Sequence, residues 1–126
     1  MRLVNVEAAL VAHLEPLLGV QVSTVVPSTR PDAFVVVSRI GGNVANLGVS
    51  RVSVLVGCWG SSRTKAWGVV ADAWSAVAAI DEPDLVGGLM AVNEVSVAEP
   101  VNYPDPVSKS PRYQFIASLT VALPWE

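Results

Sequence analysis

The amino-acid sequence predicts an α+β domain, in which two main helices pack on a mixed, mostly antiparallel β-sheet, in the order α-β-β-β-α-β-β. Two segments carry apolar residues at helical spacing, and five others are rich in β-branched residues, which favour strands. Helices and strands do not alternate strictly, which argues against the parallel sheet of a βαβ protein. We find no internal repeat and no domain boundary, so residues 1–126 are expected to form one domain.

The first helix is expected over residues 5–18, because apolar side chains recur there at steps of three or four. Asn5 is the candidate N-cap, and Gly19 can supply the left-handed residue that ends the helix. Pro16 removes an amide donor and clashes with the preceding turn, so it predicts a kink or an end near Glu15.

The second helix, over residues 61–80, has the clearer apolar stripe and begins at a candidate N-cap, Ser61 or Ser62. The glycines at positions 41 and 42 are expected to end the strand over residues 34–40. The expected strands cover residues 20–26, 34–40, 49–59, 89–98 and 112–123.

Residues 99–111 contain four of the nine prolines. Proline cannot donate a hydrogen bond to a sheet interior, so this segment is predicted to be an exposed, extended loop or arm. Such a stiff segment loses little conformational entropy on binding, and we expect it to reach a neighbouring protein.

The composition excludes several classes of protein. The chain is 52% hydrophobic and 15% charged, against about 25% charged in an average domain. Disordered chains have low hydrophobicity and high charge, so this composition argues against disorder. Its longest uncharged run, residues 16–29, is shorter than the roughly 18 apolar residues of a membrane span and contains two prolines. The net charge is −3 and the basic residues are scattered, which argues against sequence-specific DNA binding. The apolar excess therefore indicates surface that is buried against partners.

The sequence has no recognised motif for catalysis, metal binding or a cofactor. His13 has no nucleophile at a recognised spacing, and one histidine with one cysteine cannot form a zinc site. The glycine pair at 41–42 lacks the pattern of a phosphate-binding loop, and the acidic run 81–84 lacks the spacing of a calcium loop. Cys58 is expected to be a buried, inert thiol, although the nearby helix start and Arg63 leave a reactive thiol as the alternative.

Four tryptophans in a small domain also favour interfaces, because tryptophan buries a large area and still satisfies one polar group. Trp74 fits the helical stripe that faces the sheet. Trp125 follows Pro124 close to the C-terminal end and is more easily a docking anchor than a core residue.

Four features of the sequence occur together. The first is a helix followed by a turn and a valine-rich strand, over residues 6–26. The second is the run Phe-Val-Val-Val-Ser-Arg-Ile-Gly-Gly that begins at Phe34. The third is a strand followed by an alanine-rich helix, over residues 52–80, and the last is the proline-rich run 104–115 that leads into the closing strand. With these four features the chain resembles the tail terminator (tail completion) proteins of long-tailed bacteriophages.

The resemblance implies a non-enzymatic virion protein that forms a hexameric ring on the last ring of tail-tube protein. Such a ring ends tube polymerisation and joins the tail to the head–tail connector, and DNA passes through its lumen without sequence-specific binding. The protein would be made in the host cytoplasm and lie at the head-proximal end of the tail, with no cofactor and no membrane. The candidate interface residues are Arg39, Tyr103, Asp105, Lys109, Arg112 and Trp125.

Two alternatives stay open at this stage. One is another head–tail connector or neck component, which shares the structural class and differs in stoichiometry. The other is a small-molecule-binding or thiol-dependent α+β domain that uses Cys58.

Overall fold

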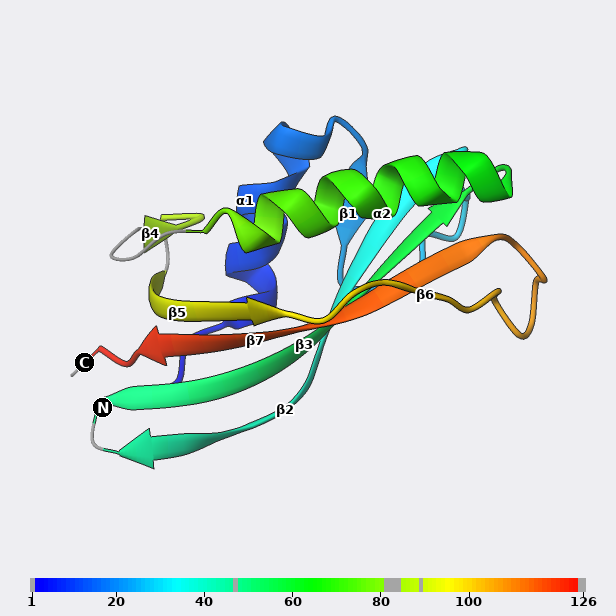
Figure 1. Cartoon of the computed structure of the whole chain (residues 1–126). Helices are drawn as coiled ribbons and strands as arrows, with labels where there is room; N and C mark the ends of the chain where they lie inside the picture. Colours follow the sequence, from blue (N-terminus) through cyan, green and yellow to red (C-terminus); the bar gives the residue numbers. More distant parts are fainter. Residues whose placement is uncertain (1, 47, 81–84, 89, 125–126) are drawn as a thin grey trace.

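Both helices lie on one face of a seven-stranded sheet in the computed structural model, which describes residues 2–46, 48–80, 85–88 and 90–124 (Figure 1). The predicted α+β class and the order of the main elements are confirmed. The elements are α1 (Val6–Leu18), β1 (Gln21–Ser23), β2 (Ala33–Asn46), β3 (Val49–Gly60), α2 (Arg63–Ala78), β4 (Leu85–Val86), β5 (Met90–Val97), β6 (Val101–Asn102) and β7 (Arg112–Ala122).

The strands follow the order β1-β2-β3-β7-β5-β4 across the sheet, and β6 pairs with β7. Only the pair β1–β2 is parallel among these neighbours, so the sheet is mixed and mostly antiparallel, as predicted. β3 lies at the centre and pairs along nearly its whole length with β2 on one side and β7 on the other. The two short strands β4 and β6 were not expected from the sequence.

The helix caps are those that the sequence predicts. The Asn5 side chain accepts a hydrogen bond from the Ala8 amide, and Gly19 ends α1 with a φ of 66°. The Ser62 side chain accepts from the Lys65 amide and caps α2. The predicted end near Glu15 is wrong, because α1 continues through Pro16 to Leu18, which packs against the core. The alternative, a kink near Glu15, stays a prediction.

Two strand predictions need correction. The expected strand over residues 20–26 shrinks to Gln21–Ser23, because the Ser23 hydroxyl donates to the Val25 carbonyl and the chain turns away. The glycine pair does not end β2. That strand shifts register between Arg39 and Gly41 and then continues along β3 to Asn46.

The core lies between the helices and the sheet. Alternate residues of β2, β3 and β7 face the helices, which pack on them through one apolar side of α1 and one of α2. Its largest fully buried side chains include Leu10, Leu14, Met90, Phe115 and Leu119. The opposite face of the sheet has no helix among the described residues, and loops and short segments cover it only in part (Figure 1).

Candidate interface on the open face of the sheet

A small aromatic cluster lies on the open face, at the end of the sheet where β2 begins and β3 ends. Phe34 and Trp59 are paired across these two strands, and their rings stack with centroids 4.8 Å apart and an interplanar angle of 12°. Val36 completes this second buried cluster, which is separate from the main core. Offset stacking of this kind stabilises a pair of aromatic rings beyond the area that they bury.

The loop between β6 and β7, residues 103–111, folds over this cluster through Asp105. Asp105 is 7% exposed, and one oxygen of its carboxylate accepts hydrogen bonds from the Val107 amide at 2.9 Å and the Ser108 amide at 3.2 Å. Its other oxygen accepts from Trp59 Nε1 at 3.2 Å and lies 3.5 Å from the Arg30 guanidinium. The Val107 amide is the largest of these influences, and together they lower the pKa of Asp105 well below its usual range.

Arg112 clamps the same loop from β7. Its guanidinium carbon lies 5.1 Å from the Trp59 ring centroid and 5.0 Å from that of Tyr103, so the cation is held between two aromatic faces. Arg112 Nε also donates to the Tyr103 carbonyl at 2.9 Å. Of the two forms predicted for this segment, an extended loop or an arm, the structure has a loop that side chains tie to its own sheet.

The structure brings together three of the six predicted interface residues, Tyr103, Asp105 and Arg112. Asp105 and Arg112 form hydrogen bonds within their own chain, so their role between subunits stays a prediction. Tyr103 is half-exposed beside them. Lys109 lies on the outer side of the same loop, with a φ of 64°, and its amide donates to the Asp105 carbonyl.

The two other predicted interface residues lie elsewhere. The Arg39 amide donates to the Glu7 carboxylate at 2.7 Å, and its guanidinium donates to the Val4 carbonyl at 3.3 Å, so Arg39 ties β2 to the start of α1. Trp125 lies outside the residues that the structure describes.

The remaining tryptophans are divided between the core and the surface. Trp74 packs against the main core as predicted, and its Nε1 donates to the Ala98 carbonyl at 2.9 Å. Trp67 is exposed and contacts Tyr113 edge to face. Sequence reasoning missed the Phe34–Trp59 cluster, which an alignment of the two predicted strands as a hairpin would have indicated.

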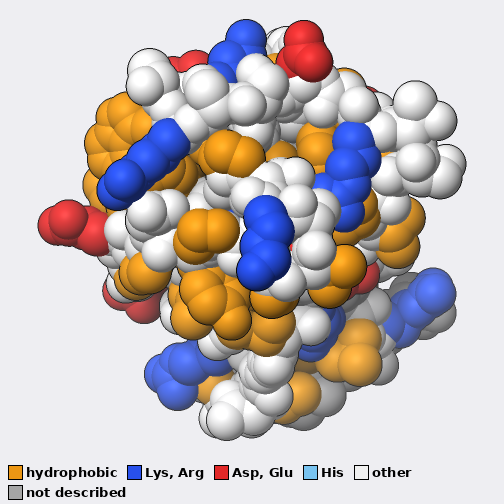
Figure 2. Space-filling view, turned by 90° about the vertical axis from the view of Figure 1, so that its right-hand side faces the viewer, with side chains coloured by type: hydrophobic (Ala, Val, Ile, Leu, Met, Phe, Trp, Pro, Cys, Tyr) orange, Lys and Arg blue, Asp and Glu red, His pale blue; other side chains and the backbone are white. Residues whose placement is uncertain are grey.

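The end of the molecule that lies to the right in Figure 1 carries the β6–β7 loop and the start of α2. Figure 2 shows that hydrophobic side chains are distributed over this end between separate Lys and Arg side chains, while Asp and Glu lie mainly toward its margins. The fold thus brings to one end basic residues that are scattered in the sequence. Exposed apolar side chains are typical of a protein contact surface, and arginine is enriched in such surfaces.

Candidate groups for catalysis are poorly placed in the described part of the chain. Cys58 lies on β3 with its side chain fully buried in the main core, and burial raises the pKa of its thiol far above the ordinary value. His13 lies half-buried on α1. The described residues contain no group of three or more His, Cys, Asp or Glu that could hold a metal ion, and none of their helices is long and apolar enough to cross a membrane.

The buried thiol leads to a direct prediction. We expect Cys58 in the native protein to resist a water-soluble thiol reagent and to react fully once the chain is unfolded in urea, because only the thiolate is nucleophilic and it is not exposed. Absorbance of the released reagent measures the reaction. Rapid labelling without denaturant would contradict the buried position and would favour a thiol-dependent function.

Comparison with known proteins finds a shared fold. No family model and no curated protein matches this sequence. A chain in a solved structure described as "Virion of native gene transfer agent (GTA) particle" superposes with a TM-score of 0.59 and 18% sequence identity. The match covers 87% of this chain and 84% of that chain, so the two share the fold over nearly their whole lengths.

Proposed function

We propose that this protein is a structural component of a phage-like virion and forms a hexameric ring that caps the tail tube. The observation that carries the proposal is the fold, which extends over 87% of the chain and matches a chain of a gene transfer agent virion. The sequence resemblance to tail terminator proteins independently indicates the same class. In this role the ring ends tube polymerisation and offers its other side to the head–tail connector.

The surface of the subunit suits a ring. Each subunit of a ring uses two different surfaces to contact its two neighbours, and two more surfaces to contact the structures above and below. Exposed apolar side chains occur on several elements, which include Leu17 on α1, Ile40 on β2, Trp67 on α2 and Ile116 on β7. We infer that the apolar excess of the composition is divided among these contacts.

The chemistry of the described residues supports a structural role rather than an enzymatic one. The candidate nucleophile, Cys58, is buried, and Asp105 is engaged in holding a loop. The net charge of −3 gives −18 for six copies, which would let DNA pass through the lumen without tight binding. The basic end seen in Figure 2 is then expected to face away from the lumen.

Particle symmetry tests the proposal. We expect the purified protein, alone or with tail-tube protein, to form six-fold rings in electron micrographs, with a mass near six times 13.2 kDa by light scattering. A twelve-fold ring would favour the alternative function, another head–tail connector component, over a tail terminator. A protein that stays monomeric at high concentration and does not bind tail tubes would overturn the virion proposal.

A further inference from the structure

We propose that a groove on the helix side of one copy receives the β6–β7 loop of a second copy, with Val107 as the inserted side chain. This contact rests on the proposed ring and specifies how neighbouring subunits would be joined. The groove lies on the helix side of the sheet, and the loop lies on its open face.

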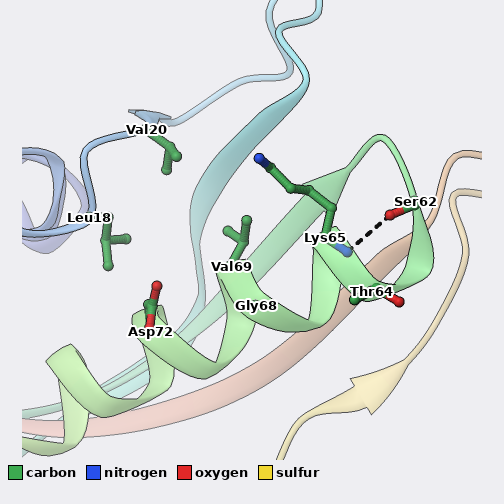
Figure 3. Close-up of a pocket in the computed structure, with 8 residues that line it drawn as sticks. All are labelled: Leu18, Val20, Ser62, Thr64, Lys65, Gly68, Val69 and Asp72. Carbon is green, nitrogen blue, oxygen red and sulfur yellow. Dashed lines mark hydrogen bonds between the residues drawn. The ribbon is translucent and has the colours of Figure 1, made fainter.

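The groove lies between α2 and the segment that joins α1 to β1, and its volume is about 520 Å³. Leu18 and Val20 form one wall, and Val69 with Gly68 forms the other (Figure 3). Lys65 reaches across the groove toward Val20 at one end, while Asp72 lies near Leu18 at the other. An apolar floor between two opposite charges suits an apolar side chain that is flanked by a charged one.

Gly68 is the independent sign that something enters this groove. It lies inside α2 at an exposed position, and a Cβ built there would meet nothing within 4 Å. Glycine weakens a helix interior relative to alanine, so a glycine that the packing of its own chain does not require is unexpected there. A partner that approaches the α2 backbone closely gives a reason for the missing side chain.

The β6–β7 loop has the complementary shape and charge. Val107 is 88% exposed, the highest value among the exposed large hydrophobic residues described, and Asp105 fixes its amide. A side chain that the fold already holds in place loses little entropy on binding. Lys109 lies two residues further on and is exposed. Neither Lys109 nor Asp72 has an ion-pair partner within the described ranges, so each is free to pair with the other across the contact.

The positions of the two parts determine the kind of assembly. The loop folds onto the open face, where Asp105 binds Trp59, whereas the groove lies on the helix side. The sheet lies between the loop and the groove, so the two surfaces face opposite sides of one chain (Figure 1). A contact between two different surfaces repeats from copy to copy and closes into a ring when the rotation allows it.

Cysteine cross-linking tests the contact directly. The double variant Val107→Cys with Thr64→Cys, which places one thiol on the loop and one on the groove, is incubated at high concentration with a mild oxidant. We expect a reducible ladder that extends beyond dimers on a non-reducing gel. The two single variants serve as controls and should not form this ladder, since the native Cys58 is buried.

Further variants separate the effect on the contact from the effect on the fold. Gly68→Ala should raise the melting temperature by about 4 °C and, in the double-cysteine background, lower the cross-linked fraction by about tenfold. Ser75→Ala, also exposed on α2 but outside the groove, should leave the cross-linked fraction unchanged. Asp72→Lys should likewise reduce cross-linking, and adding Lys109→Asp should restore it.

The outcomes distinguish this proposal from the proposed function. Wild-type rings without any cross-linked ladder, or Gly68→Ala with undiminished cross-linking, would overturn the loop–groove contact and leave the ring proposal standing. Cross-linking that stops at dimers would overturn a repeating contact in favour of a two-fold one. A wild-type protein that never assembles would overturn both proposals.

Discussion

The Gly60→Ala variant is expected to lose about 3 kcal/mol of unfolding free energy, which is a large fraction of the stability of a domain of this size. Gly60 is the last residue of β3, directly before the turn into α2. A Cβ at this position would overlap the Ala66 nitrogen and lie 2.8 Å from the Ala66 Cα. These are backbone atoms and cannot rotate away, so the first turn of α2 has to move.

The displacement affects both the core and the groove. Ala66 is fully buried, and Lys65 in the same turn lines the groove on the helix side. Urea unfolding followed by circular dichroism measures the loss. Gly41→Ala is the matched control, because a Cβ there meets nothing within 4 Å, and it should leave the midpoint nearly unchanged. Equal midpoints for the two variants would contradict the close approach of β3 and α2.

The parts of the fold that follow from local chemistry are visible in the sequence. Asn5 and Ser62 cap helices because their side chains bond to amides three residues further along, so both ends of that interaction lie within one short window. The alternating apolar residues of β3 and β7 likewise predict which side faces the helices. The prediction that the glycines at 41 and 42 end β2 is wrong, because pairing with β3 extends the strand beyond what local propensity indicates.

The candidate interface depends on contacts between distant residues, so it was only partly predictable. Asp105 is expected in a contact segment from the prolines around it, but its partners Trp59 and Arg30 are 46 and 75 positions away in the sequence. Only the fold reveals that the proline-rich segment is tied down rather than free. The groove beside Gly68 is formed by α2 with the segment after α1, and no spacing in the sequence indicates it.

Removing the carboxylate of Asp105 is expected to release the β6–β7 loop. Asp105→Asn keeps an oxygen that can accept from the Val107 and Ser108 amides, but it turns an NH₂ group toward two donors, Trp59 Nε1 and Arg30. We expect a loss of about 2 kcal/mol in unfolding free energy at pH 7, and about 3 kcal/mol for Asp105→Ala, which loses all of these bonds.

The dependence of this loss on pH follows from the direction of the pKa shift. The pKa of Asp105 is lower in the folded state than in the unfolded chain, where it is about 3.9, so the folded state gains stability above that value. The gain disappears as the pH falls below about 4 toward the folded-state pKa, where the wild-type carboxylate is also protonated. The difference between wild type and Asp105→Asn should therefore shrink as the pH falls from 7 to 3.

Urea unfolding at pH 7, 5, 4 and 3, followed by circular dichroism, measures this difference. The exposed residue Asp32, near the same end of β2, provides the control Asp32→Asn. A constant difference between wild type and Asp105→Asn at all four values would contradict a stabilising charge at Asp105. If Asp105 holds Val107 in place for a neighbouring subunit, Asp105→Asn should also weaken the cross-link from Val107→Cys at pH 7, where the chain remains folded. Loss of this cross-link with the fold retained would connect the internal contacts of the open face to assembly of the ring.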